Sequence, residues 1–305
     1  MVLLRQALTD ARTEGYTVAG FSGGEPLLYA SLREVLSHAR GLDMLTTVTS
    51  NGTLLDSRRL AAIADVTSLL AISLDGVRES HDRVRGLRAF ARMEKHLEAV
   101  GRCGIPFGFI FTLTQHNVDQ LEPLAKFALE HGAKLLQIHP LEMLGRAATL
   151  MRGQRPDAIE ASVAYIEAAR IQQEYGGQLL VHIDLFDRDL LRQVPESVLA
   201  ATGPQPWDAP LAELVSPLVV EPDATVVPIR YGFGRAYALG NLLHAPLSEL
   251  SRQWRRNRLR SFRALCRRLH RRVTVPTVLP FFNWYEAIGA ASLRRGSTTL
   301  ASAGR

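Results

Sequence analysis

Clusters of glycine and polar residues recur along the first half of the sequence, and each follows an apolar segment. They are Gly23-Gly24-Glu25-Pro26, Asn51-Gly52, Ser73 with Asp75, Thr112 with Thr114, and His139 with Glu142 and Gly145-Arg146-Ala147. Asn-Gly and Asp-Gly pairs are common in ordinary turns, so one cluster alone would be a weak sign of a site. Five clusters that each follow an apolar segment are stronger evidence for a binding site. Turns with only a structural role should be equally frequent before these segments.

The chemistry of these clusters suits an amino acid joined to a nucleoside. In Gly23-Gly24-Glu25-Pro26, the glycines let the backbone approach a ligand and leave their carbonyl groups free to accept hydrogen bonds from an ammonium group. The glutamate adds negative charge there, and the proline stiffens the turn. Ser73 and Asp75 offer a hydroxyl and a carboxylate for a ribose, and Arg85 offers a guanidinium fork for a carboxylate.

The segments that carry the clusters predict alternating strands and helices. Strands are predicted over 17–22, 44–50, 68–74, 106–113 and 134–139, and helices over 29–40, 56–65, 87–102 and 117–131. Single helices between strands imply parallel strands with right-handed crossovers, and strands that are apolar almost throughout indicate burial on both faces. The predicted fold class is α/β, with a partial (β/α) barrel whose mouth gathers the five clusters.

The pattern changes after about residue 150, which divides the chain into three predicted domains. Residues 1–150 form the barrel-like part. Residues 151–212 contain a helix, a segment that fits a sixth strand at 178–186, and a linker rich in proline and glycine at 202–210. Residues 213–305 contain a hairpin in LVVEPDATVVPI, an arginine-rich helix and an apolar tail, which predicts a small α+β extension.

Composition excludes several classes of protein. The chain has 305 residues, 47% of them hydrophobic, which is enough for one large core and a smaller unit. No apolar run reaches the roughly 18–20 residues that span a bilayer, and the N-terminal apolar stretch is too short for a signal peptide. We therefore expect a cytoplasmic protein without a membrane segment.

The positive charge of the chain is local. The formal net charge is +6, but ten arginines and no acidic residue lie between Arg252 and Arg272, so the remainder carries 6 − 10 = −4. An arginine-rich helix can neutralise phosphates. The acidic remainder nevertheless argues against a nucleic-acid partner and favours a solvated helix face or a docking site for an acidic peptide.

The metal-ligating residue types do not form a site in the sequence. Cys103 and Cys266 are the only cysteines, too few for a zinc site or an iron–sulfur cluster of the usual kind. The histidines lack the spacing of metal ligands, and three aspartates are interpreted as a solvated loop: His81, His116, His131, His139, Asp184, Asp187 and Asp189. No metal ligand is therefore predicted.

Four ordered segments within residues 14–150 resemble the motifs of radical S-adenosylmethionine (SAM) enzymes: GFSGGEPLLY, TSNGTLLD, AISLDGVRESHDRVRG and IHPLEMLGRA. In the family, the first motif contacts the methionyl amine of SAM, the serine of the third lies near the ribose, and an arginine twelve residues later, here Arg85, lies near the SAM carboxylate. The resemblance implies a SAM site formed by Gly23, Gly24, Glu25, Pro26, Asn51, Ser73, Asp75 and Arg85. It assigns no acid–base catalyst.

Two departures from the family affect the iron–sulfur chemistry. The family's cluster cysteines, CxxxCxxC, follow its first strand and precede the GGEP helix, whereas no cysteine precedes Cys103 here. The barrel is therefore expected to lack its first strand, through truncation, a misplaced start or true loss of the cluster. Residues 213–305 resemble a SPASM or twitch extension, but Ile229 stands after Pro228 where relatives carry a cysteine, so no auxiliary cluster is expected.

Two functions follow from the resemblance. The first is a radical SAM enzyme, or a fragment of one, that uses SAM, a [4Fe–4S] cluster and an electron donor to modify a peptide, protein or small molecule. In such an enzyme the cofactor performs the difficult chemistry and the protein supplies orientation and exclusion of water. The alternative is a catalytically inactive binding module for a peptide or partner protein. A CxxxCxxC motif in the reading frame upstream of Met1 would separate them.

Overall fold

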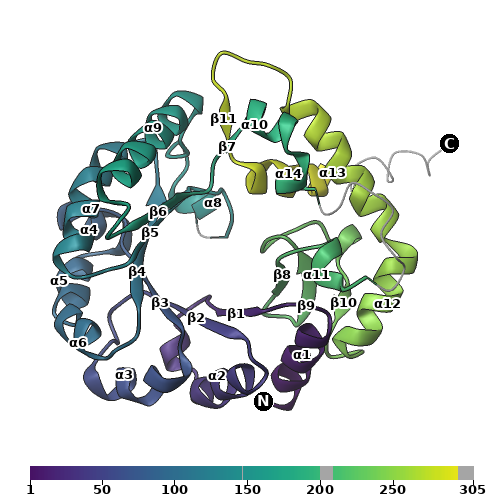
Figure 1. Cartoon of the computed structure of the whole chain (residues 1–305), viewed down its shortest axis with the longest axis horizontal. Coiled ribbons are helices and arrows are strands. Elements are labelled where there is room, and N and C mark those ends of the chain that lie inside the picture. Colours follow the sequence, from purple (N-terminus) through teal and green to yellow (C-terminus); the bar gives the residue numbers. More distant parts are fainter. Residues whose placement is uncertain (146, 200–208, 295–305) are drawn as a thin grey trace. The chain divides into compact units, whose positions relative to one another are not determined.

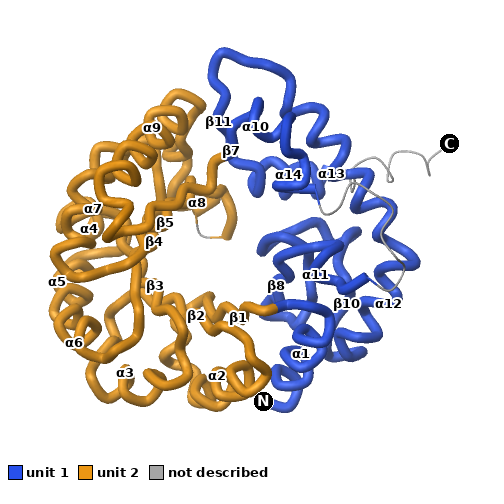
Figure 2. Tube along the Cα trace, viewed as in Figure 1, with its two compact units in different colours: residues 1–16, 186–305 blue, residues 17–185 orange. Residues whose placement is uncertain are grey.

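The computed structural model describes residues 1–145, 147–199 and 209–294, and it divides into two compact units (Figures 1 and 2). One unit runs from Thr17 to Leu185, and the other combines residues 1–16 with residues 186–305. Arg146 and residues 202–208 of the predicted linker lie outside the described residues. The domain boundaries predicted at residues 150 and 212 remain predictions. The two compact units reflect which residues pack together, and such packing does not test boundaries that were drawn from sequence composition.

The unit of residues 17–185 is built on six parallel strands in the order β1-β2-β3-β4-β5-β6. The strands are β1 Val18–Phe21, β2 Leu45–Ser50, β3 Leu69–Ser73, β4 Phe107–Leu113, β5 Leu135–Pro140 and β6 Leu180–Ile183. All five predicted strands are confirmed, and the segment at 178–186 supplies the sixth. The α/β fold with a partial barrel is therefore confirmed.

Helices cover one face of this curved sheet (Figure 1). They are α2 Leu32–Gly41, α3 Ser57–Ile63, α4 Glu79–Arg85, α5 Ala89–Glu94, α6 Leu97–Arg102, α7 Leu121–Glu130 and α9 Ala158–Tyr175, whereas the short α8 Ala147–Leu150 lies on the other face. The core between helices and sheet is aliphatic and aromatic, with Phe109 and Phe111 of β4 fully buried. Every residue of β4 is buried or half-buried, on both faces of the sheet, which explains why this strand is apolar almost throughout.

The helix predicted over 87–102 is interrupted, and this part of the prediction is wrong. The chain forms α5 and α6, separated by Lys95 and His96. The His96 N–H donates to the carbonyl group of Met93, three residues back, at 3.0 Å. This tighter turn breaks the regular α-helical bonding that the apolar spacing predicted.

The second unit contains short antiparallel sheets and helices. Its elements are α1 Val2–Thr13, β7 Phe186–Asp187, α10 Arg188–Gln193, α11 Leu211–Leu214, β8 Leu218–Val220, β9 Thr225–Pro228, β10 Gly240–Asn241, α12 Leu247–Asn257, α13 Leu259–Val273, β11 Phe281–Phe282 and α14 Trp284–Leu293. Strands β8 and β9 form the predicted hairpin, with β10 added beside β9. The arginine-rich segment forms two helices instead of one, because the chain leaves the helical conformation at Arg258.

Helix α1 is fixed within this second unit by buried charges. The Glu14 carboxylate pairs with Arg255 of α12 at 2.7 Å, and their side chains are only 15% and 7% exposed. Asp10, which is 7% exposed, accepts the Ser248 N–H at 3.0 Å at the start of α12. The N-terminal residues therefore pack with elements more than 230 positions later in the sequence.

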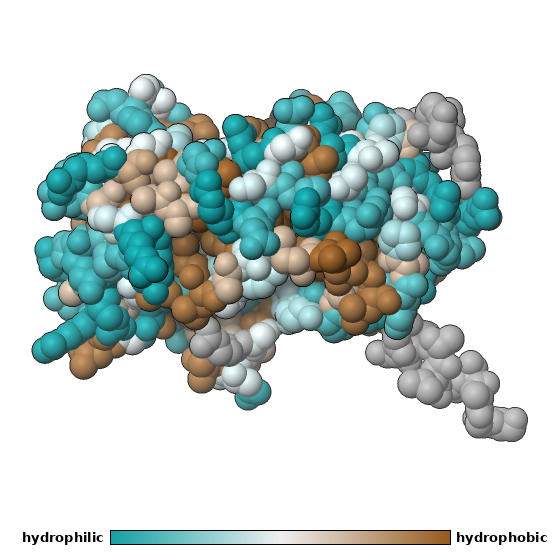
Figure 3. Space-filling view, turned by 90° about the horizontal axis from the view of Figure 1, so that it is seen from below, coloured by the Kyte–Doolittle hydropathy of each residue, from teal (hydrophilic) through white to brown (hydrophobic). Residues whose placement is uncertain are grey.

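The molecular surface is mixed in polarity. No helix among the described residues is both long and apolar enough to cross a membrane. The face drawn in Figure 3 carries hydrophilic residues with hydrophobic ones in separate patches between them.

Candidate functional site

The predicted site residues lie along one edge of the six-stranded sheet. Because the strands are parallel and sequence neighbours pair with each other, their carboxyl ends meet at the same edge. Gly23 and Gly24 follow β1, Asn51 follows β2, Ser73 ends β3, and His139 lies one residue before the end of β5. This shared edge was predicted and is confirmed, whereas the binding roles of these residues remain predictions.

The turn after β1 exposes two consecutive peptide groups. Gly23 and Gly24 have φ values of +84° and +52°, in the left-handed region, and a Cβ on either would meet nothing within 4 Å. These two positions therefore favour glycine because of their backbone conformation, and not because neighbouring atoms would crowd a side chain. Glu25 accepts the Leu27 N–H at 3.2 Å and the Asn51 N–H at 2.8 Å, so its carboxylate also connects the ends of β1 and β2.

Asn51 holds the turn after β2. Its Oδ1 atom accepts the N–H of Thr53 at 2.9 Å and the hydroxyl of Thr53 at 2.6 Å. Gly52 has φ +81°, and a Cβ there would lie 2.3 Å from Cγ of Met93. The Asn-Gly pair therefore has a structural role, in agreement with the simple turn interpretation, and this role does not prevent Asn51 from contacting a ligand.

Asp75 organises the end of β3 and is only 1% exposed. Its Oδ1 accepts the Thr112 N–H at 2.9 Å, and its Oδ2 accepts Nε of Arg85 at 2.5 Å. Its own N–H donates to Nδ1 of His81 at 3.1 Å. The carboxylate thus positions Arg85 and connects the ends of β3 and β4, a role that the ribose assignment from sequence did not include.

Arg85 and His81 both lie on α4 and surround this carboxylate. The Arg85 side chain is 35% exposed, and its two terminal nitrogens have no hydrogen-bond partner among the described residues, so the fork can receive a carboxylate. Burial lowers the pKa of His81, which accepts a hydrogen bond through Nδ1 and is therefore neutral. His81 is 1% exposed, as expected for a core histidine.

A histidine–aspartate–histidine cluster lies at the ends of β5 and β6. Oδ2 of Asp184 bonds to Nδ1 of His139, and Oδ1 pairs with Nε2 of His182 at 3.2 Å. Burial by itself would raise the pKa of Asp184, but the hydrogen bonds from the two imidazoles outweigh it and lower the pKa to about 2. The same contact raises the pKa of His182.

The interpretation of Asp184 as part of a solvated loop is wrong. The Asp184 side chain is only 15% exposed and carries two partners, because parallel pairing of β5 with β6 brings its strand end beside His139. Asp187 caps α10 by accepting the N–H groups of Asp189 and Leu190. The sequence signal for this cluster is the pattern His-x-Asp at residues 182–184, at the end of an apolar strand. The sequence alone does not show which strand lies beside it.

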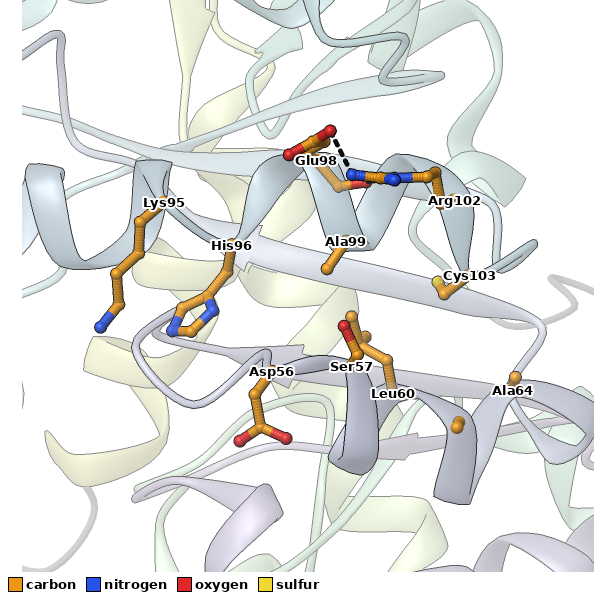
Figure 4. A pocket seen from close by; sticks show the side chains of 11 residues that line it. Asp56, Ser57, Leu60, Ala64, Lys95, His96, Glu98, Ala99, Arg102 and Cys103 are labelled. Carbon is orange, nitrogen blue, oxygen red and sulfur yellow. Dashed lines mark hydrogen bonds and ion pairs between the residues drawn. The ribbon is translucent and has the colours of Figure 1, made fainter.

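A separate pocket of about 760 Å³ lies in the helical layer, between residues 56–64, which include α3, and residues 95–103, which include α6 (Figure 4). Asp56, Lys95, His96 and Cys103 are among its lining residues, and none of the eight candidate SAM-binding residues lines it. It belongs to the helical layer and not to the strand ends, so we do not assign it to the proposed ligand.

The described residues do not fit an iron–sulfur cluster. They contain no group of three or more cysteine, histidine, aspartate or glutamate side chains arranged to hold a metal ion. Cys103 and Cys266 belong to different compact units. Burial raises the pKa of Cys266 to about 12, which disfavours the thiolate that a cluster needs.

Comparisons with known proteins relate the chain to the radical SAM enzymes. Residues 3–128 match the sequence model described as "Radical SAM superfamily", in agreement with the resemblance of the sequence motifs in this segment. The chain is 30% identical over 146 residues to Fe-coproporphyrin III synthase of Methanosarcina barkeri, a match covering 47% of this chain and 37% of the relative. It is 27% identical over 210 residues to PqqA peptide cyclase of Xanthomonas axonopodis pv. citri, covering 65% of this chain and 54% of the relative.

Solved structures share the fold at low sequence identity. SuiB of Streptococcus suis aligns with a TM-score of 0.62 and 16% identity, over 86% of this chain and 61% of SuiB. The enzyme anSMEcpe, solved with bound AdoMet and a Cp18Cys peptide, aligns with a TM-score of 0.57 and 18% identity, over 83% of this chain and 73% of that protein. These likenesses concern the fold alone, and the chain spans about 37–54% of the curated relatives described above.

Proposed function

We propose that the chain is the SAM-binding and substrate-binding part of a radical SAM enzyme that modifies a peptide or protein in the cytoplasm. The main support is that residues from four family motifs follow each other, in order, along the shared carboxyl edge of parallel strands. This edge is where ligands bind in α/β barrels. An electron donor and a [4Fe–4S] cluster belong to the same proposal, with the cluster ligands outside the described residues.

The proposed SAM site combines two glycines with open space around them, the half-exposed Arg85 and the buried Ser73. The exposed carbonyl groups of Gly23 and Gly24 hold the amine, the terminal nitrogens of Arg85 hold the carboxylate, and Ser73 contacts the ribose. Asp75 keeps Arg85 in place through its Nε atom. When bound, SAM supplies the radical chemistry, and the protein residues orient it and exclude water.

A peptide is the favoured substrate class. The match to PqqA peptide cyclase covers 210 residues, and the match to Fe-coproporphyrin III synthase covers 146. The longer match covers 65% of this chain and therefore extends past residues 1–150. Within the same proposal, residues 1–150 are the core, 151–212 a connection, and 213–305 a SPASM- or twitch-like extension without cluster cysteines. Ile229 is buried there with φ +67°.

Residue-resolved NMR titration with SAM tests the proposed site. We expect saturable binding in the high micromolar range or weaker, because the cluster that also chelates SAM in the family is not held by these residues. Resonances of Gly23, Gly24 and Ser73 should shift, and ATP, which has the nucleoside but not the amino acid, should not displace SAM. Unchanged resonances at these three residues would overturn the assignment.

The second candidate is a catalytically inactive module that binds a peptide or partner protein. It is favoured by one observation, the poor fit of the described residues to a cluster. A CxxxCxxC motif in the reading frame upstream of Met1, with formation of 5′-deoxyadenosine by the encoded protein under dithionite, supports the enzyme. Peptide binding without any 5′-deoxyadenosine supports the module.

A further inference from the structure

The His139–Asp184–His182 cluster has features that the proposed SAM site does not use. Each carboxylate oxygen of Asp184 has its own imidazole partner, Nδ1 of His139 at Oδ2 and Nε2 of His182 at Oδ1. The backbone N–H of Asp184 donates to the Ile138 carbonyl group at 3.0 Å, which fixes the aspartate beside β5. The two histidines lie in adjacent parallel strands, and Asp184 directly follows the last residue of β6.

Exposure differs sharply across the cluster. The Asp184 side chain is 15% exposed, that of His139 is 38% exposed, and that of His182 is 60% exposed. The carboxylate is thus covered, whereas the imidazoles reach solvent at the same edge as the proposed SAM site. Nε2 of His139 has no hydrogen-bond partner among the described residues. One nitrogen of His139 is therefore held and the other is available.

A metal site and a purely structural pair explain these features less well. The described residues contain no group of three or more cysteine, histidine, aspartate or glutamate side chains that could hold a metal ion, so His139, Asp184 and His182 do not form such a site. A structural pair would be expected to bury its imidazole, as His81 does at 1% exposure. His139 instead presents a free nitrogen at the ligand-binding edge, and a carboxylate that orients the far nitrogen of a histidine is the usual arrangement for proton transfer.

We propose that His139 is a proton-transfer residue for the substrate and that Asp184 is its positioning residue. This inference rests on the proposed function, since it places a substrate at the strand-end edge. Neutral His139 keeps its Nδ1 proton in the bond to Asp184, and Nε2 carries the lone pair. A hydroxyl, thiol or ammonium group of the substrate gives its proton to Nε2. The new N–H bond forms as the substrate X–H bond breaks, its electron pair stays on X, and the imidazolium later releases the proton to water.

The role of His182 in this proposal is to hold the other carboxylate oxygen. With Oδ1 engaged by His182, Asp184 cannot rotate away from His139 without losing a contact. The low pKa of Asp184 keeps the carboxylate ionised, so it acts as an acceptor for the Nδ1 proton and is not itself the proton carrier.

Long-range ¹H–¹⁵N NMR spectra of the histidine rings test the tautomer directly. In the wild-type chain, neutral His139 should carry its proton on Nδ1, with a lone pair on Nε2. In Asp184→Asn, the amide can donate as well as accept, and we expect a larger fraction of the Nε2–H tautomer. A wild-type His139 that is mainly the Nε2–H tautomer, or that stays doubly protonated between about pH 6 and 9, would overturn the proposal.

Carbethoxylation by diethyl pyrocarbonate, followed by mass spectrometry, measures the reactivity of Nε2. We expect His139 to react about threefold or more faster in the wild type than in Asp184→Asn, because the lone pair is presented only in the correct tautomer. His116 is the control: it is exposed, lies beyond the end of β4, and has no side-chain partner among the described residues. Its rate should not change. Equal His139 rates in both proteins would contradict the positioning role of Asp184.

Substrate turnover separates this inference from the proposed function. In a longer protein that carries the upstream CxxxCxxC motif and turns over its substrate, His139→Gln should lower kcat and leave SAM affinity unchanged, and His116→Gln should change neither. Loss of SAM binding in His139→Gln would mean that the residue belongs to the cofactor site, and unchanged kcat would remove the catalytic role. Failure of wild-type SAM binding would instead count against the proposed function, while the tautomer and carbethoxylation results would still stand.

Discussion

At the scale of single residues, Arg85 connects the structural and ligand-binding roles of the sheet edge. Its Nε atom is bound to the buried Asp75, and its two terminal nitrogens are open. A guanidinium held in this way loses little further entropy when it binds a carboxylate. The buried aspartate therefore explains why an arginine on a short helix can serve a precise contact.

Arg85→Ala should weaken SAM binding by about 1.5–3 kcal/mol, the usual value for a charge-assisted contact. NMR titration suits the measurement because it reads weak dissociation constants. Arg83→Ala is the matched control, since Arg83 lies on the same helix and is exposed, with no partner among the described residues. An Arg85→Ala protein that binds SAM as the wild type does would show that the carboxylate contact is assigned to the wrong residue.

The His182–Asp184 contact should make stability depend on pH. The pKa of His182 is raised, so its contribution is complete below the unfolded-state pKa and is lost as pH rises through the folded-state pKa. The pKa of Asp184 is lowered to about 2, so its contribution is complete above about pH 4 and is lost as pH falls toward 2. The free energy of unfolding in urea should therefore differ most between the wild type and Asp184→Asn at pH values between about 4 and the unfolded-state pKa of histidine, about 6.5. A difference that does not vary with pH would contradict the ion pair.

At the scale of elements, the turns after the strands decide how the helical layer packs. Gly52 follows β2 with φ +81°, and a Cβ would lie 2.3 Å from Cγ of Met93 on α5. Gly104 has nearly the same φ, +80°, but a Cβ there would meet nothing within 4 Å. A comparison of Gly52 with Gly104 therefore separates the energetic cost of backbone strain from the cost of crowding a side chain.

Gly52→Ala should therefore destabilise the protein more than Gly104→Ala. Both substitutions carry the left-handed strain of about 1–2 kcal/mol, and only Gly52→Ala adds the cost of overpacking, about 1–3 kcal/mol. Thermal and urea unfolding measure both. Equal losses would mean that Met93 moves aside without cost.

The buried pair of Glu14 and Arg255 joins α1 to α12 within the second unit. Glu14→Gln leaves the arginine charge buried without its carboxylate, and we expect a loss of about 3–5 kcal/mol in unfolding free energy. Asp65→Asn, which breaks the exposed pair with Arg33, should have a much smaller effect, because solvent screens an exposed ion pair. A small loss in Glu14→Gln would indicate that water reaches the pair.

At the scale of the whole molecule, the cysteine content limits the metal chemistry of these residues. The purified 305-residue chain, reconstituted with iron and sulfide without oxygen, should not hold a stoichiometric [4Fe–4S] cluster, because a cluster needs about four ligands, chiefly thiolates. Iron and sulfide analysis with the visible spectrum measures the content. About four iron atoms per chain would show that ligands of another kind exist.

The sequence by itself determined the strands, their parallel order, the hairpin of β8 and β9 and the edge that gathers the polar clusters. These features depend on local periodicity and on turn residues, which each segment carries in its own composition. The motif order also identified the radical SAM resemblance before any geometry was known.

Only the tertiary structure decided which distant side chains become partners. His139 and Asp184 are 45 residues apart, and Glu14 and Arg255 are 241 apart. The sequence predicts that Asp184 lies in a solvated loop with Asp187 and Asp189, yet its burial depends on the register between β5 and β6. Burial and pairing are properties of the surfaces that meet after folding, so no window of the sequence contains them.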